Sequence, residues 1–291
     1  SHGHDLFDRL ATSMKEAAQV SRRIGDKQLG IPLNPDFGGK LAMRGNGPDE
    51  IALGDLRITV LGPTEKRLRE LRKEWNAWLR SAKGRRQIRA VRRDAAEDED
   101  ALINADFEHF LTLADLGPAV GDRNTVTEEN IASITLLVDE AGKTVLLTGD
   151  ARDDHLIDDL IATDKSDGDG HIHVDVLKIQ HHGSENNFSE DFGKCVTADH
   201  YLFCGNGKHE NPDERVVRQV INSRIGSSAQ RSPNPETANP FKLWFTSDGT
   251  TFKANSHHME KVKDLVETRA AASAGQMTFE FSNAASFTLE I

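Results

Sequence analysis

Side chains of the types that bind metal ions follow two apolar runs in the middle of the chain. Asp150 comes shortly after the run Thr144 to Leu147, and the pair His181 and His182 comes shortly after the run His173 to Ile179. Runs of this length and composition predict β-strands. As strands of one sheet, they would bring a carboxylate and two imidazoles to the same edge. These side chains suit Zn²⁺, Mn²⁺ or Fe, so the spacing predicts a metal site there.

The strands that must position these residues follow one another in the sequence. Ile131 to Val138 and Thr144 to Leu147 are joined by a turn that contains Gly142, a pattern typical of a buried hairpin. His200 to Cys204 predicts a further strand, and His209 lies in the loop after it. With helical patterns between them, these strands predict an α/β fold.

Four motifs occur in a fixed order along this part of the chain. They are Asn130-x-x-Ser133, Leu146-Leu147-Thr148-Gly149-Asp150, Asp175-Val-Leu-Lys178 with His181-His182-Gly183-Ser184, and Gly205-Asn-Gly207-Lys-His209. The series resembles the second half of the metallo-β-lactamase superfamily, and within it the branch of competence DNA-uptake hydrolases and phosphorylcholine esterases. The run Leu61-Gly62-Pro63-Thr64 also fits that branch. The resemblance covers residues 50 to 225.

The resemblance implies a fold and a metal content. The fold would be an αββα metallo-β-lactamase sandwich, incomplete at its N-terminus and with a C-terminal extension. The cofactors would be two divalent metal ions, Zn or Mn, which Asp150 bridges and for which His209 supplies a ligand of the second. Asn130 stands where many members place a metal-binding His, and it is a candidate catalytic residue.

The resemblance also implies that His181 and His182 bind the reacting phosphate, which makes both candidate catalytic residues. Ser184 and Lys178 belong to the same motif and are candidate substrate-binding residues. For Lys178 the alternative is packing, or pairing with an acidic neighbour.

Each of these side chains has a structural alternative. Asp150 could cap a helix over residues 151 to 161, because Asp is a favoured N-cap residue. His181 with His182 could be a surface pair, and His209 could be an exposed loop residue. His171 and His173 precede a strand and so face the opposite edge, which favours a structural role.

Charge is distributed unevenly along the chain. The 291 residues carry a net charge of -11, which argues against non-specific electrostatic binding of nucleic acid. Residues 66 to 93 nevertheless contain twelve Lys or Arg against two Glu. Arg85, Arg86 and Arg89 are candidate phosphate contacts of a nucleic acid substrate, and a solvated helix face is the alternative.

Cysteine content and hydropathy bear on the compartment. Cys195 and Cys204 have no CxxC spacing, so the sequence indicates neither a zinc knuckle nor a disulfide framework. No apolar run reaches the roughly 18 residues that a membrane helix needs. We therefore expect a cytoplasmic protein without a membrane partner.

The sequence divides into two parts. Residues 1 to 226 would form the metallo-β-lactamase-like portion, with a rim insertion over 94 to 129, and residues 227 to 291 a loop and an α/β extension. In the first part, Asn211 would cap a helix that runs to Ile225. The extension predicts strands at Lys242 to Thr246, Met277 to Phe281 and Ala285 to Ile291, and a helix from Met259 to Ala271.

The family's main metal-binding motif, H-x-H-x-D-H, does not occur in this sequence. The start Ser1-His2-Gly3-His4-Asp5 imitates it, but the Asp follows the second His directly and no His comes after it. Either an N-terminal fragment of the same protein carries the remaining ligands, or the chain is a relative without metals. The first case predicts a metal-dependent phosphodiester hydrolase, a nuclease; the second predicts an interaction or scaffold module.

Overall fold

The computed structural model describes residues 24, 29–82, 85, 86, 89, 132–250, 256–282, 284 and 286–291. It divides the chain into two compact units. One comprises Ser1–Ala42 and Glu65–Asp122, and the other Met43–Thr64 and Arg123–Ile291. The predictions for Asn130, for the insertion over 94 to 129 and for the first five residues lie outside the described residues.

The described part of the first unit contains a short 3₁₀ helix, η1 (Pro35–Phe37), and the helix α2 (Glu65–Arg80). The helix α2 contains the start of the basic segment, for which a solvated helix face is the alternative to a phosphate contact. Glu65 and Arg69 form an ion pair one turn apart, which supports an exposed helix face. Arg85, Arg86 and Arg89 are helical and exposed.

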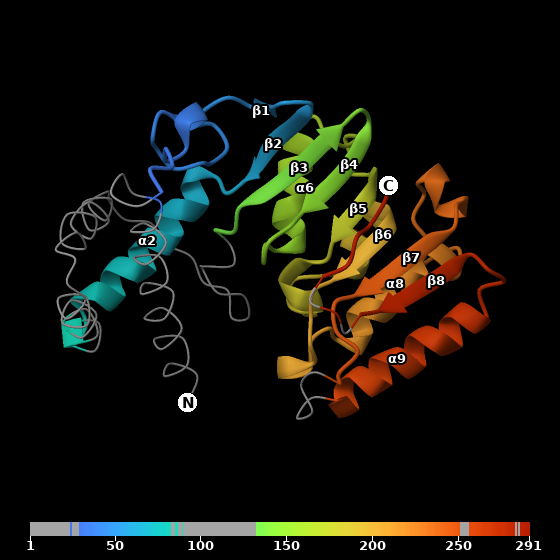
Figure 1. Ribbon diagram of the computed structural model, residues 1–291. Coiled ribbons are helices and arrows are strands. Elements are labelled where there is room, and N and C mark those ends of the chain that lie inside the picture. Colours follow the sequence, from blue (N-terminus) through green and yellow to red (C-terminus); the bar gives the residue numbers. More distant parts are fainter. Residues whose placement is uncertain are drawn as a thin grey trace. The chain divides into compact units, whose positions relative to one another are not determined.

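The second unit is built on one eight-stranded mixed sheet whose strands follow sequence order from β1 to β8 (Figure 1). The strands β1 to β4 pair antiparallel, and β4 to β8 pair parallel. The bounds are β1 Glu50–Leu53, β2 Leu56–Gly62, β3 Thr135–Glu140, β4 Lys143–Leu147, β5 Ile172–Lys178, β6 Val196–Phe203, β7 Phe241–Phe245 and β8 Met277–Phe281. The α/β fold is confirmed, and the C-terminal extension adds β7 and β8 to the same sheet.

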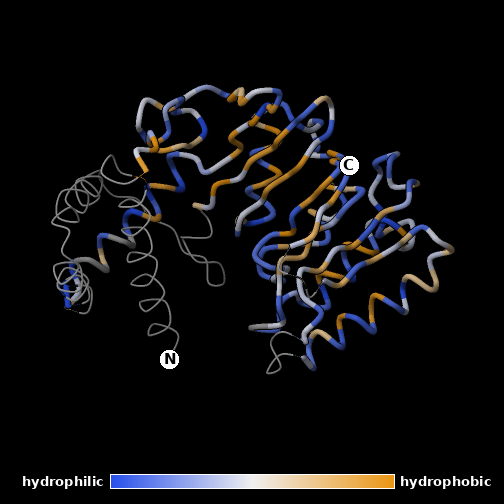
Figure 2. Tube along the Cα trace, in the orientation of Figure 1, coloured by the Kyte–Doolittle hydropathy of each residue, from blue (hydrophilic) through white to orange (hydrophobic). Residues whose placement is uncertain are grey.

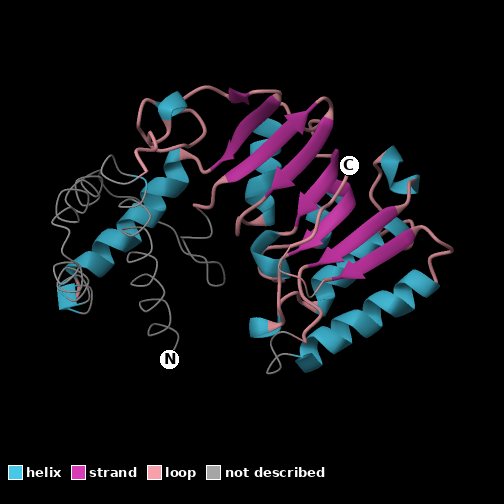
Figure 3. Ribbon diagram, viewed as in Figure 1, coloured by secondary structure: helices cyan, strands magenta, loops and turns pink. Residues whose placement is uncertain are grey.

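Helices connect the parallel strands, as such connections require (Figure 3). They are α6 (Asp153–Ala162), α7 (Glu190–Cys195), α8 (Glu214–Ile225) and α9 (Ser256–Ala271). Three short 3₁₀ helices lie in the loops: η3 (Gln180–Gly183), η4 (Lys208–Glu210) and η5 (Pro235–Ala238). No helix in the described residues is long and apolar enough to cross a membrane.

The predicted hairpin before Asp150 is confirmed as β3 and β4. Its turn consists of Ala141 and Gly142, both with positive φ (54° and 83°). Two successive left-handed residues give the turn a twist that matches the flanking strands. The first strand begins at Thr135 rather than Ile131.

Two local predictions are wrong. The N-cap of α8 is Asp213 rather than Asn211, and its side chain does not cap the helix, because its carboxylate accepts a hydrogen bond from Glu185 N at 2.7 Å. The end of the chain, 286–291, is not a strand of the sheet. It has no ladder partner among the described residues, and Phe287 instead stacks on Trp244 with ring centroids 5.4 Å apart.

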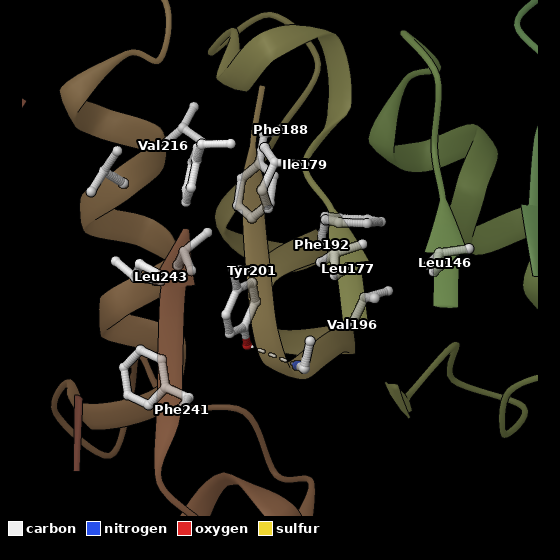
Figure 4. Close-up of a cluster of buried hydrophobic side chains, with 14 of the residues drawn as sticks. Leu146, Leu177, Ile179, Phe188, Phe192, Val196, Tyr201, Val216, Phe241 and Leu243 are labelled. Carbon is white, nitrogen blue, oxygen red and sulfur yellow. Dashed lines mark hydrogen bonds between the residues drawn. The ribbon is translucent and has the colours of Figure 1, made fainter. Parts of the chain in front are cut away.

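One face of the sheet forms the core with the helices (Figure 4). Leu146, Leu177 and Leu243 on this face are fully buried. The hydrophobic residues concentrate in the strands (Figure 2). Tyr201 places its hydroxyl inside this cluster, where it accepts a hydrogen bond from Ala198 N at 3.0 Å.

The opposite face carries a second row of side chains, all apolar except Lys178, that strand register aligns across the sheet. The row reads Val60, Leu136, Leu147, Lys178, Leu202, Trp244. The C-terminal segment crosses this face in front of the sheet, whereas α6 and α8 lie behind it (Figure 1). Leu147 is 38% exposed, so this face is only partly covered.

Leu146 and Leu147 are neighbours on β4 that point to opposite faces, which makes them a matched pair. Leu146→Ala should lower the free energy of unfolding by about 2–5 kcal/mol, because it leaves a cavity in the core. Leu147→Ala should cost less than about 1.5 kcal/mol, since its side chain already contacts solvent. Urea unfolding of both variants measures the difference, and equal losses would contradict the assignment of the two faces.

Candidate functional site

The strands β4, β5 and β6 are parallel, so their carboxyl ends lie at the same edge of the sheet. Three loops follow them: Thr148 to Arg152, Ile179 to Ser189 and Cys204 to Asp213. In open α/β sheets, ligands bind beyond the carboxyl ends of the strands. The described candidate residues of the second unit all lie in these loops or at a strand end.

Asp150 lies in a tight turn in which the preceding residue, Gly149, must be a glycine. Gly149 has a φ of 54°, and a Cβ there would come within 2.9 Å of the Ser133 Cβ. The Ser133 hydroxyl accepts a hydrogen bond from Asp150 N at 3.1 Å. The N-cap residue of α6 is Arg152, which excludes the capping role for Asp150. The half-buried Asp150 carboxylate forms no hydrogen bond or ion pair within the described residues.

Lys178 stabilises this turn through two hydrogen bonds. Its Nζ donates a hydrogen bond to Gly149 O at 2.9 Å, and Thr148 Oγ1 donates to Lys178 O at 2.7 Å. Burial lowers the pKa of Lys178, and the nearby Asp150 and Cys204 oppose that shift. Burial likewise raises the pKa of the Cys204 thiol, which Lys178 opposes. These contacts favour the alternative of packing beside an acidic neighbour over contact with substrate.

His181 and His182 are held in the left-handed region, with φ of 41° and 59°. His181 N donates to Gly149 O at 3.1 Å, which ties the pair to the Asp150 turn. The Nδ1 atom of His181 lies 2.9 Å from Asn187 Oδ1, and that of His182 lies 2.8 Å from Cys204 O. The two rings meet edge to face, with centroids 6.0 Å apart.

Two glycines let the histidine loop pack against the loop that carries His209. Gly183 has a φ of 89°, and a Cβ there would lie 2.5 Å from the Pro212 Cβ. A Cβ on Gly205 would come within 2.9 Å of His182 O. The Asp213 N–H donates to Gly183 O at 2.9 Å and closes the contact.

The remaining predicted residues differ in their surroundings. His209 is exposed, has a φ of 57°, and lies in η4 of the loop that Gly205 begins. Ser184 is buried, and its hydroxyl accepts a hydrogen bond from Asn186 N at 3.4 Å. Arg85, Arg86 and Arg89 belong to the first unit.

The histidines at the start of β5 have structural partners, as expected. The His171 ring pairs with Asp167, with Nδ1 to Oδ2 3.1 Å. His173 contacts Thr197 Oγ1 at 2.9 Å and Asp199 Oδ1 at 3.2 Å, and burial lowers its pKa. Both side chains are therefore engaged away from the carboxyl edge.

No group of three or more His, Cys, Asp or Glu side chains that could hold a metal ion occurs in the described part of the chain. Asp150 and His209 would therefore supply only part of a metal site. The donor types fit Zn²⁺ or Mn²⁺, and the Asp150 carboxylate, which lies near Lys178, forms no hydrogen bond or ion pair in the described residues.

Two buried amides at this edge were not predicted. Asn187 is fully buried and bonds to both the Asp150 turn and His181. Gln180 is fully buried, and neither the oxygen nor the nitrogen of its amide has a hydrogen-bond partner among the described residues. The signal in the sequence was a polar residue directly beside an apolar one, at Ile179-Gln180 and at Asn187-Phe188.

A pocket of about 430 Å³ lies elsewhere in the second unit, between β2 and the end of α6. Its two cationic side chains are already paired: Arg44 with the buried Asp159 at 3.2 Å, and Lys165 with Glu50 at 3.7 Å. We assign no ligand to it.

Comparison of the chain with known protein families, curated proteins and solved structures found no match.

Lys178→Met should change how stability depends on pH. Because burial lowers the pKa of Lys178 below 10.5, the folded state releases this proton at a lower pH than the unfolded state. The unfolded state then binds more protons, so the free energy of unfolding gains a contribution that rises with pH in this window. We expect Lys178→Met to remove this rise in urea unfolding between neutral pH and about pH 10.

The exposed Lys261 on α9 provides the control. Lys261→Met should leave the pH dependence of stability as it is in the unsubstituted protein. If Lys178→Met and Lys261→Met give the same pH profile, Lys178 is not desolvated in the folded state.

Proposed function

We propose that this chain is part of a metal-dependent phosphodiester hydrolase whose site lies at the carboxyl edge of the sheet. The observation that carries the proposal is the linkage of Asp150 and His181 through Gly149 and Asn187, with the neighbouring His182 held at Cys204 O. Three loops thus hold one carboxylate and two imidazoles in a fixed arrangement. This arrangement is what a metal-dependent hydrolase needs.

In this proposal, Asp150 and His209 are ligands of two divalent metal ions, Zn or Mn. When bound, such a pair supplies an activated hydroxide and stabilises charge on the phosphoryl oxygens. The protein's own contribution is to fix Asp150 by the Ser133 and Asn187 hydrogen bonds and to orient both histidines. His181 and His182 then lie at the phosphate.

An N-terminal fragment of the same protein would supply the remaining ligands and the second layer of an αββα sandwich. The partly covered face of the sheet supports this, because Leu136 and Leu147 lie side by side there and Leu202 follows beyond Lys178. Apolar sheet faces are normally buried against another layer. The two unpaired cysteines remain compatible with a cytoplasmic setting.

An interaction or scaffold module is the second candidate. The absence of a three-ligand group from the described residues favours it, as do the exposed Arg85, Arg86 and Arg89. In that case the carboxyl edge would be a structural remnant, and the basic helix would carry the function.

Asp150→Ala separates the two candidates. In the longer protein that includes the N-terminal fragment, we expect this change to lower bound metal and to reduce turnover of bis-p-nitrophenyl phosphate. The reduction should exceed about 100-fold, the upper end of what loss of an outer-shell partner costs. Asp158→Ala, an exposed carboxylate on α6, is the control and should leave both unchanged. Metal content and turnover that survive Asp150→Ala would favour the scaffold.

The choice of nucleic acid as substrate rests on the basic segment. If Arg85, Arg86 and Arg89 contact phosphates, binding of DNA should weaken steeply with added salt. Changing the three together to Ala should reduce the slope of log affinity against log salt by about 1 per residue. The control changes the exposed Lys261, Lys263 and Arg231 together to Ala. This removes the same charge and should leave the salt dependence of DNA binding unchanged. A salt-independent activity would indicate a small phosphodiester instead.

A further inference from the structure

The Asn187 side chain can be oriented unambiguously from its neighbours. It is fully buried, and its Nδ2 donates to Asp150 O at 2.8 Å and lies 3.4 Å from Ala151 O. Carbonyl oxygens only accept hydrogen bonds, so the amide nitrogen must face them. The amide oxygen, Oδ1, therefore faces His181 Nδ1 at 2.9 Å.

This orientation fixes the position of the proton on His181. Because Oδ1 can only accept, Nδ1 must carry the hydrogen, and the neutral ring keeps its lone pair on Nε2. The backbone carbonyl of Cys204 imposes the same tautomer on His182, since it too can only accept from Nδ1. Both histidines are thus set in the Nδ1–H form, one by a side chain and one by the backbone.

We propose that Asn187 is a positioning residue that sets His181 as an electron-pair donor and couples it to the Asp150 turn. Its amide bridges the two with a donor at Nδ2 and an acceptor at Oδ1. A hydrogen bond of this kind to the second ring nitrogen is what orients histidines in metal sites.

The Nδ1–H form changes what His181 and His182 can do in the proposed function, on which this inference rests. A neutral ring in the Nδ1–H form cannot donate from Nε2 to a phosphate oxygen. Its Nε2 can bind a metal ion, or it can accept a proton from water or from a substrate hydroxyl. The pair would bind phosphate through Nε2 only as imidazolium.

Nitrogen-detected NMR of the chain labelled with ¹⁵N-histidine tests the proposal without any need for activity. In spectra recorded at about pH 8, long-range correlations distinguish the protonated from the unprotonated ring nitrogen. His181→Gln and His182→Gln spectra assign the signals. We expect both histidines to show a protonated Nδ1 and an unprotonated Nε2. A proton on Nε2 of His181 would overturn the proposal.

Substitutions then test the cause. Asn187→Leu removes the acceptor, so the Nε2–H form of His181 should become populated. His182 serves as an internal control, because its partner is a backbone carbonyl, and its tautomer should not change. Asn186→Leu, at the exposed neighbouring position, should change neither ring. An unchanged His181 in folded Asn187→Leu would also overturn the proposal.

Asn187→Asp provides a second variant if Asn187→Leu does not fold. It retains an acceptor for His181 but loses the donor to Asp150 O, so the Nδ1–H form should persist. Loss of that form in a folded Asn187→Asp protein would contradict the proposal. In the longer protein, Asn187→Leu should reduce turnover by about 10- to 100-fold. Absence of turnover in the unsubstituted protein would refute the proposed function and leave the tautomer result standing.

Discussion

The second unit depends on burying one face of an eight-stranded sheet under helices that also connect its strands. Because β4 to β8 are parallel, each connection must return the chain from the carboxyl edge to the amino edge. The helices that do so bury Leu146, Leu177 and Phe203 on the same face. These residues immediately precede the loops of Asp150, of the histidine pair and of Gly205. Core packing therefore determines where the candidate site lies.

The sequence predicted this arrangement well where local pattern and tertiary packing agree. Apolar runs bounded by polar loops gave the strands around Asp150 and His181, because a buried strand needs such a run. Sequence-based prediction failed where a side chain forms its hydrogen bonds with residues that are distant in the sequence. Asp213 accepts from Glu185, 28 positions earlier in the chain, instead of capping its own helix. Asn187 was overlooked for the same reason, since its partners become neighbours only in the folded protein.

The two faces of the sheet are unequal, and this bears on the site. Helices cover one face, whereas the other retains a row of aliphatic side chains that 286–291 only partly covers. Lys178 lies in that row between Leu147 and Leu202. Its amine is desolvated there and turns to Gly149 O, the carbonyl that also accepts from His181 N. A lysine that would be out of place in an apolar row thus stabilises the turn that carries Asp150.

Backbone strain at the edge shows how strongly the rest of the fold constrains the histidines. His181, His182 and His209 all have positive φ, a conformation that costs a non-glycine residue roughly 1–2 kcal/mol. Three such residues persist only where surrounding contacts determine the backbone. Those contacts include the Gly149, Gly183 and Asn211 carbonyls, each of which accepts a backbone hydrogen bond. Because glycine would relieve the strain at these three positions, the surrounding contacts must offset the cost of placing a histidine side chain there.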